Sequence, residues 1–447
     1  MSTNIKQMDG IVVVSDFIVL ACAAYLLLIN LKHLLWSSRI VYFLVFFALY
    51  VFPVFLDYLA GFQEHYHWGY YVVSHNSTTR VIYDVLLIIV MYSLTFINNR
   101  GSIDSFRDSL SKQNIRLNSK YSSLIYFFIV FPTIAVLLLM RNPEILYTFQ
   151  WREFELFSDG GSYSTIERFV YFGIVCSVVI LFDNKSSFWN IRRLFALLFL
   201  YINVCIQGKR AILFFAIIAI LLVVVFQYIT LRIQKKSTFL FTVVFMSLFS
   251  IGVAYMIWSS IEVKIGRGYS ETAEDMLYTS TRIDMFREDR VKMAIYSEQH
   301  PNKIKILDYK GQSLITDIVS IIPFNYISEP MGLSQGTYQV HFSMAMFGEK
   351  YNNNNPKANR NYMTCTIWAE LISNFGIVIG SIFFIMLTLW FIKLTDKYPY
   401  PYNIFIITTY SLLNLFDFTY IVLFIELTWL FCYKYRKSIY NKATVKS

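Results

Sequence analysis

The stretch that decides the fold is residues 363–392, which read MTCTIWAELISNFGIVIGSIFFIMLTLWFI. Only one of these residues, Glu370, is charged. A bilayer core about 30 Å thick takes roughly 20 apolar residues as a helix, so an apolar run of this length predicts a membrane span.

The same pattern recurs along the whole chain, and it predicts an all-α polytopic membrane protein with about eleven transmembrane helices. We divide the chain into helices 1–8 (residues 1–260), one large external loop (261–362), and helices 9–11 with a basic cytoplasmic tail (363–447). The other ten apolar runs lie near residues 11–30, 40–61, 81–97, 121–140, 167–183, 194–207, 210–231, 239–260, 402–416 and 418–433.

The composition agrees with a membrane protein. Of 447 residues, 56% are hydrophobic and 15% are charged, whereas a typical soluble domain carries about 25% charge. This deficit argues against a soluble enzyme, a nucleic-acid-binding protein and a disordered chain.

The distribution of Lys and Arg predicts the orientation. Twenty of them fall on one set of alternate short loops and in the C-terminal tail, and seven fall on the opposite set. Because the Lys- and Arg-rich side is usually cytoplasmic, we expect the C-terminus inside and the N-terminus outside.

A cationic pair begins one predicted span on the external side, in Gln207-Gly208-Lys209-Arg210. The two charges can anchor the helix at the interface. Alternatively, the amides of a helix N-terminus beside a guanidinium form an anion site, and the Arg fork matches a phosphate.

The external loop carries a second basic cluster, with Arg282, Arg287 and Arg290. One interpretation is a solvated helix in which the acids at 284, 288 and 289 pair with these arginines. The other is a second clamp for a phosphate or a sugar.

Glu370 is a carboxylate in a predicted membrane helix, where a charge is costly unless it is paired. It has two interpretations, a structural pair with Arg360 and a catalytic group. Gly376 and Gly380 form a G-x-x-x-G pattern, which is typical of close helix packing.

His341, in the external loop, is a candidate general base.

The sequence holds no G-x-x-x-x-G-K-[ST] motif, so we expect no ATP site. The cysteines and histidines show no convincing ligand spacing, and we expect neither a metal nor a cofactor.

The chain resembles the O-antigen and capsule repeat-unit polymerases (Wzy-type), which are relatives of the O-antigen ligases. The likeness is mostly architectural, with many spans and one large external loop before the third-last helix. Gly208-Lys209-Arg210-Ala211 resembles the family's opening of a central helix, and Glu370 with Asn374–Gly380 resembles the helix after its large loop. The stretch 359–362 lacks the His that ligases and some polymerases place there.

The resemblance implies a metal-independent glycosyltransferase on the outer leaflet of a bacterial inner membrane. It would polymerise undecaprenyl-diphosphate-linked oligosaccharide units into a surface polysaccharide, with a chain-length regulator and a flippase as possible partners. The expected roles are Arg210 for the diphosphate with Lys209 assisting, Arg282 and Arg287 for the same anion or for sugar hydroxyls, Arg290 and Arg360 for substrate binding, and Glu370 or His341 for the acceptor proton.

Two other functions stay open from the sequence. An O-antigen ligase differs only in its acceptor. A lipid-linked oligosaccharide flippase or other transporter should carry charges deep within its spans, whereas we expect the charges of this sequence at the external rim and in one loop.

Overall fold

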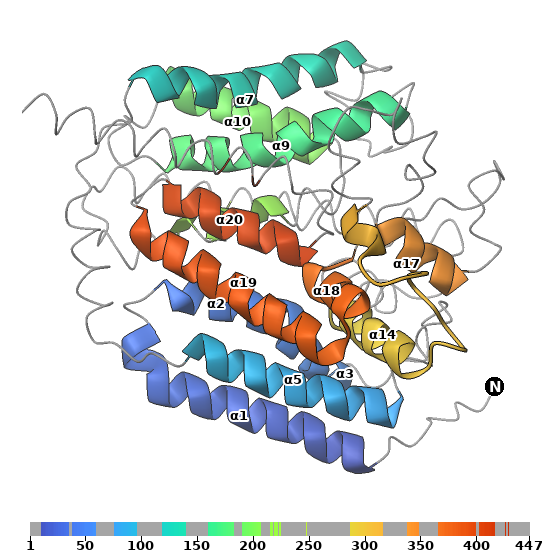
Figure 1. The fold of residues 1–447 in the computed structure, drawn as a ribbon. Coiled ribbons are helices and arrows are strands. Elements are labelled where there is room, and N and C mark those ends of the chain that lie inside the picture. Colours follow the sequence, from blue (N-terminus) through green and yellow to red (C-terminus); the bar gives the residue numbers. More distant parts are fainter. Residues whose placement is uncertain are drawn as a thin grey trace, which may run out of the picture. The chain divides into compact units, whose positions relative to one another are not determined.

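A computed structural model describes residues 10–34, 38–59, 76–95, 119–139, 160–182, 190–206, 287–315, 338–347, 365–398 and 402–415, with scattered residues in 215–224 and at 247, 425 and 428. Every regular element among the described residues is helical, which confirms the all-α expectation for this part of the chain (Figure 1). The main helices are α1 (Gly10–Leu34), α2 (Arg39–Phe46), α3 (Phe52–Leu59), α5 (Ser77–Thr95), α7 (Ser119–Leu139), α9 (Gly160–Leu181), α10 (Ile191–Leu200), α14 (Glu288–Gln299), α17 (Tyr338–Phe347), α18 (Ile367–Phe375), α19 (Ile377–Lys397) and α20 (Tyr402–Leu415).

Four stretches are long and apolar enough to cross a bilayer. Two shorter helices, Tyr126–Leu138 and Phe169–Leu181, are also apolar. Three predicted spans lie mostly outside the described residues, namely those near 210–231, 239–260 and 418–433. The four long stretches are Gly10–Ile29, Arg39–Leu56, Ser77–Thr95 and Ile377–Lys397.

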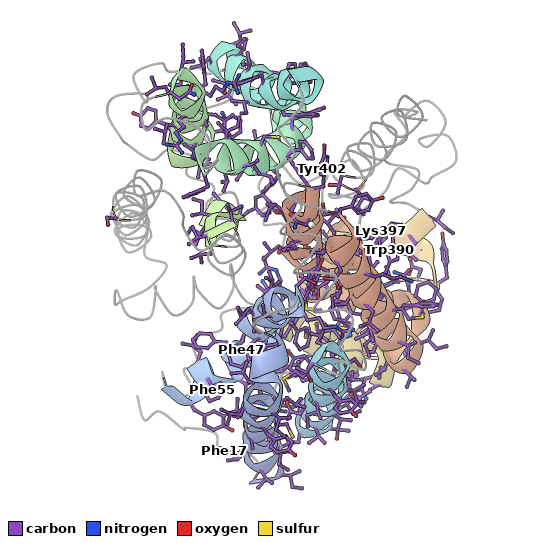
Figure 2. The ribbon with its side chains drawn as sticks, turned by 90° about the vertical axis from the view of Figure 1, so that its left-hand side faces the viewer. Phe17, Phe47, Phe55, Trp390, Lys397 and Tyr402 are labelled. Carbon is purple, nitrogen blue, oxygen red and sulfur yellow. The ribbon has the colours of Figure 1, made fainter. Side chains whose placement is uncertain are left out.

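The long helices expose apolar faces, as a lipid-facing helix does. Phe17 on α1 is 57% exposed and Trp390 on α19 is 49% exposed (Figure 2). Other exposed apolar residues follow one side of each helix at spacings of three, four and seven residues, for example Ile11, Val14, Ile18, Tyr25 and Ile29 on α1, and Val378, Ile382 and Met386 on α19.

The chain divides into two compact units. Unit 1 comprises residues 1–103, 278–396 and 409–430, and unit 2 comprises residues 104–277, 397–408 and 431–447. Each unit is therefore assembled from segments that lie far apart in the sequence.

In unit 1, the first three spans alternate in direction. The second span consists of α2, a π-helical turn η1 (Phe47–Val51) and α3. At one end, Tyr58 of α3 donates to Asp16 near the start of α1, and we call this the Asp16 end. At the other end, Arg39 of α2 donates to the carbonyl of Leu94 in α5 at 3.1 Å, and we call this the Arg39 end.

An aromatic core holds unit 1 together around Trp368 of α18. Its ring stacks on Phe384 of α19 at 5.0 Å between centroids and meets Tyr50 edge-on at 5.3 Å. Phe46 and Tyr83 complete the cluster. Aromatic pairs of this kind add roughly 0.5–1.5 kcal/mol each beyond the burial of their area.

The apolar run 363–392, predicted as one span, is instead two helices that meet at Gly376. Gly376 has φ +84° and ψ 169°, a conformation that is essentially restricted to glycine. The chain reverses there, and Gly380 of α19 then packs directly against the backbone of Leu371 in α18. Gly380 therefore serves close helix packing, as predicted, whereas Gly376 makes the turn.

Unit 2 packs α7 against α9 and α9 against α10. Gly173 of α9 allows this packing, because a side chain there would overlap the carbonyl of Phe128 and the ring of Phe199. Asn190 caps α10, its side-chain oxygen accepting from the backbone amide of Arg192 at 3.1 Å.

Candidate functional site

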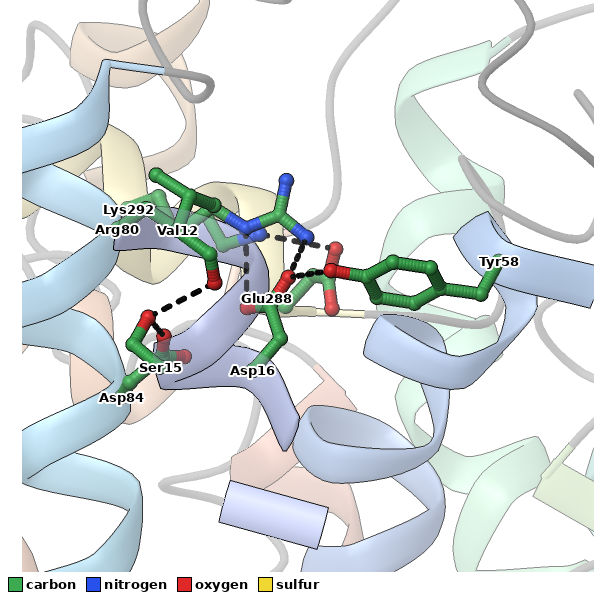
Figure 3. A network of polar contacts seen from close by, with 8 residues as sticks. All are labelled: Val12, Ser15, Asp16, Tyr58, Arg80, Asp84, Glu288 and Lys292. Atoms are coloured by element: carbon green, nitrogen blue, oxygen red, sulfur yellow. Dashed lines mark hydrogen bonds and ion pairs between the residues drawn. The ribbon is translucent and has the colours of Figure 1, made fainter. Parts of the chain in front are cut away.

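A buried ion pair joins the first turns of α5 to α1 (Figure 3). Arg80 donates from Nη2 to Oδ2 of Asp16 at 2.6 Å and from Nε to Oδ1 at 3.2 Å. Arg80 is 1% exposed and Asp16 is not exposed. The hydroxyl of Tyr58 donates a further bond to Asp16 at 2.7 Å, so this carboxylate accepts three hydrogen bonds.

A second carboxyl group, Asp84, lies one turn further along α5. Its Oδ2 is hydrogen-bonded to Oγ of Ser15, the residue before Asp16 (Figure 3). Because charged groups at membrane depth are costly, two carboxyl groups and a guanidinium inside candidate spans indicate a functional site.

Helix α14 adds further buried charge. Lys292 donates to Glu288 at 3.2 Å across one helical turn, and its ammonium lies 5.2 Å from the centroid of the Tyr83 ring. Charged side chains from Arg287 to Arg290 are each 1% exposed. The described part of this cluster is therefore not a solvated helix, which was one of the two predicted interpretations.

The start of α14 lies at half the depth of the second span. The backbone amide of Arg287 donates to the carbonyl of Leu49 at 3.1 Å. Leu49 lies ten residues from either end of the Arg39–Leu59 stretch, about 15 Å at 1.5 Å per residue. The far end of α14 reaches the Asp16 end, where Gln299 accepts from Thr79 of α5 at 2.7 Å.

Helix α18 runs the same way. Before its first turn, Thr366 is hydrogen-bonded to Tyr50 of η1, whose hydroxyl also donates to Asn414 at 2.9 Å. After its last turns, the carbonyl of Ser373 accepts from Lys310 at 3.0 Å, and Lys310 also pairs with Glu298 near the end of α14.

We call α14 and α18, which pack against each other, the half-depth helices. Both have their N-terminal ends at the middle of the second span and their C-terminal ends at the Asp16 end. Because helix N-termini carry partial positive charge, this arrangement favours negative charge at the middle of the unit.

Glu370 lies in the first turn of α18 and is fully buried. It accepts a hydrogen bond from Ser313 at 2.8 Å, and Ser313 in turn accepts from the side chain of Asn374 at 2.7 Å. A carboxylate in the first helical turn is also favoured by the helix dipole.

His341 lies on α17, which contacts α18. Tyr338, one turn before His341, is hydrogen-bonded to the hydroxyl of Ser373 at 2.9 Å. Burial raises the pKa of the Tyr338 phenol well above its usual range, so Tyr338 is a neutral hydrogen-bonding group there.

Four of the eight predicted site residues are described, and all four lie in unit 1: Arg287, Arg290, Glu370 and His341. Their helices are in contact, since α14 packs on α18 and α17 is hydrogen-bonded to α18. Nε of Arg287 donates to the carbonyl of Leu415 at 3.1 Å, at the end of α20. A cation at this position also stabilises a helix C-terminus. The other four, Lys209, Arg210, Arg282 and Arg360, lie outside the described residues.

Sequence reasoning missed the pairing of Asp16, Arg80 and Asp84. The available signal was weak: a lone acid in the first apolar run, and an Arg and an Asp four residues apart at the start of the third. Asp16 and Asp84 lie about two turns inside α1 and α5 and are buried, so the prediction that the charges lie at the external rim and in one loop does not include them.

Within the described ranges, no group of three or more His, Cys, Asp or Glu side chains is arranged to hold a metal ion. Comparisons of the chain with models of protein families, with curated proteins and with solved structures find no match. The apolar helices define the class to which the chain belongs, the multi-pass membrane proteins.

Proposed function

We propose that this protein is a membrane glycosyltransferase that polymerises polyprenyl-diphosphate-linked oligosaccharides into a surface polysaccharide. The observation that carries the proposal is the buried start of α14, where Arg287 and Arg290 lie at the helix N-terminus halfway through unit 1. Fixed cations and a helix N-terminus at one place favour a diphosphate.

The chemistry needs negative charge to be stabilised as the bond between the sugar C1 and the diphosphate oxygen breaks. Preorganised donors in a water-poor site do this without reorganising, and removal of one typically costs about 3–4 kcal/mol of barrier. In this proposal Arg287 and Arg290 stabilise the leaving diphosphate. The roles expected from the sequence for Lys209, Arg210, Arg282 and Arg360 stay predictions, because these residues lie outside the described ranges. Glu370 accepts the proton of the acceptor hydroxyl, with His341 as the alternative base.

The predicted orientation agrees with an outer-leaflet reaction. The Lys and Arg bias predicts that the Asp16 end faces outward, and the half-depth helices end there. The exposed apolar faces of α1 and α19 suit contact with lipid chains, including a polyprenyl tail.

The test is electrophoresis of the surface polysaccharide from a strain that lacks the gene, complemented with variants. Loss of the protein should replace a ladder of polymer lengths with single repeat units. Arg290→Gln and Glu370→Gln should also lose the ladder at normal protein level, whereas the exposed Lys303→Gln is the matched control and should keep it. A normal ladder from Arg290→Gln and Glu370→Gln would contradict the proposal.

The same experiment separates a polymerase from a ligase. Without a ligase, long chains still form on the lipid carrier but are not transferred to the final acceptor. Long lipid-linked chains in the deletion strain would therefore assign the ligase function instead.

One observation favours a transporter as the second candidate, namely the buried cluster of Asp16, Arg80 and Asp84 between candidate spans. Transporters carry charged groups within their spans, and Asp16 and Asp84 lie about two turns inside α1 and α5. A transporter variant would leave repeat units on the inner leaflet, where they are protected from a glycosidase added to intact spheroplasts. A polymerase variant would leave them exposed to it.

A further inference from the structure

Ser15 contacts two oxygen atoms with one hydroxyl group (Figure 3). Its Oγ is 3.1 Å from the carbonyl of Val12 and is also hydrogen-bonded to Oδ2 of Asp84. A serine hydroxyl carries a single proton, so it donates to one of these oxygens only. If Asp84 were ionised, one of the two contacts would lack a proton.

A proton on Asp84 satisfies both contacts. Asp84 then donates from Oδ2 to Ser15, and Ser15 donates to the carbonyl of Val12, a bond that serines often make within helices. The other oxygen, Oδ1, has no hydrogen-bond partner among the described residues, and Asp84 is 2% exposed. A buried oxygen without a partner is far less costly in a neutral acid than in a carboxylate.

Asp16, the neighbouring acid, has the opposite environment. It accepts two bonds from Arg80 and one from Tyr58, which stabilise its ionised form. Two carboxyl groups in contrasting environments commonly hold different protonation states.

The charge balance of unit 1 agrees with one protonated acid. Among its described residues, the charged side chains that are at most 2% exposed comprise four bases and five acids. One proton on an acid makes this set neutral, as low-polarity surroundings favour. The bases are Arg80, Arg287, Arg290 and Lys292, and the acids are Asp16, Asp84, Glu288, Asp289 and Glu370.

We propose that Asp84 is a proton-binding site, with the proton on Oδ2 and Ser15 as its acceptor. The charged groups that face it are Asp16 of α1, Arg80 of α5 and Lys292 of α14. Loss of the proton would put a second negative charge beside Asp16, where it would compete for Arg80. Protonation of Asp84 therefore controls the contact between α1 and α5, independently of whether the protein is a transferase.

Infrared spectroscopy of the full-length protein in lipid nanodiscs tests this directly, because only protonated carboxyl groups give the acid C=O stretching band. At neutral pH the wild-type protein should show a band that is absent from Asp84→Asn and retained in the control Glu370→Gln. A band that persists unchanged in Asp84→Asn, or its absence from the wild type, would overturn the proposal.

If Asp84→Asn does not fold, the Ser15→Ala variant tests whether Asp84 carries the proton. It leaves the acid in place but removes its hydrogen-bond partner, so the band should remain and move in frequency. A band at the wild-type frequency in Ser15→Ala would show that the proton is held elsewhere.

Discussion

The backbone amide of Arg287 donates a hydrogen bond to the carbonyl of Leu49, midway along a candidate membrane span. This carbonyl lacks its usual helical donor, because the residue four positions on is Pro53, which has no backbone N–H. The start of α14 is thereby fixed at half depth, which places Arg287 and Arg290 inside unit 1.

The pair of Arg80 and Asp16 should be essential for stability. Asp16→Asn leaves a guanidinium buried without its carboxylate, and we expect a loss of about 3–5 kcal/mol in the free energy of unfolding. Thermal unfolding in detergent measures it. The double variant Asp16→Asn with Arg80→Gln should recover part of the loss, because no buried charge remains; an undiminished loss would contradict this account.

Gly376→Ala should destabilise the turn between α18 and α19. An alanine at φ +84° and ψ 169° is strained, and we expect a loss of about 1–3 kcal/mol. Gly10→Ala is the matched control, because nothing lies within 4 Å of its added Cβ atom. Equal unfolding temperatures for the two variants would rule out the strained turn.

Tyr50→Phe should loosen the junction of η1, α18 and the end of α20. It removes the hydroxyl that is hydrogen-bonded to Thr366 and donates to Asn414. Because these buried partners lose a hydrogen bond, we expect the free energy of unfolding to fall by about 1–3 kcal/mol. Tyr25→Phe is the control, since Tyr25 is 63% exposed. If Tyr50→Phe unfolds at the same temperature as Tyr25→Phe, the hydrogen bonds of Tyr50 do not stabilise the fold.

Glu370→Gln should separate catalysis from structure. The amide oxygen of Gln still accepts from Ser313, so the fold should be retained while proton transfer is lost, and chain growth should fall by about 10²–10⁴-fold. Polymer yield per amount of folded protein measures this fall. A purely structural Glu370 would instead give normal polymer yield from Glu370→Gln.

Long apolar runs in the sequence predicted the positions of several helices well. The runs 40–61, 81–97 and 402–416 begin and end within a few residues of α2–α3, α5 and α20. The break at Gly376 could not be predicted, because hydropathy carries no information on φ, and a glycine four residues before another is equally typical of close packing.

The buried charges could be predicted least. Asp16 and Arg80 are 64 residues apart, and only the packing of α1 on α5 brings them together. The sequence of α14 is rich in charge and reads as a surface helix, yet its side chains are buried because they pair within the unit. Arg287, Arg290, Glu370 and His341 stood out in the sequence as chemistry-bearing groups in the loop and the helix after it, and their functional roles stay predictions.

The most direct measurement is chain growth by the purified protein in liposomes, supplied with lipid-linked repeat units extracted from the deletion strain and with a metal chelator. The account predicts a ladder of products at multiples of the repeat unit with the wild-type protein and with Lys303→Gln, and single units with Arg290→Gln. Single units with folded wild-type protein, or a full ladder with Arg290→Gln, would contradict it.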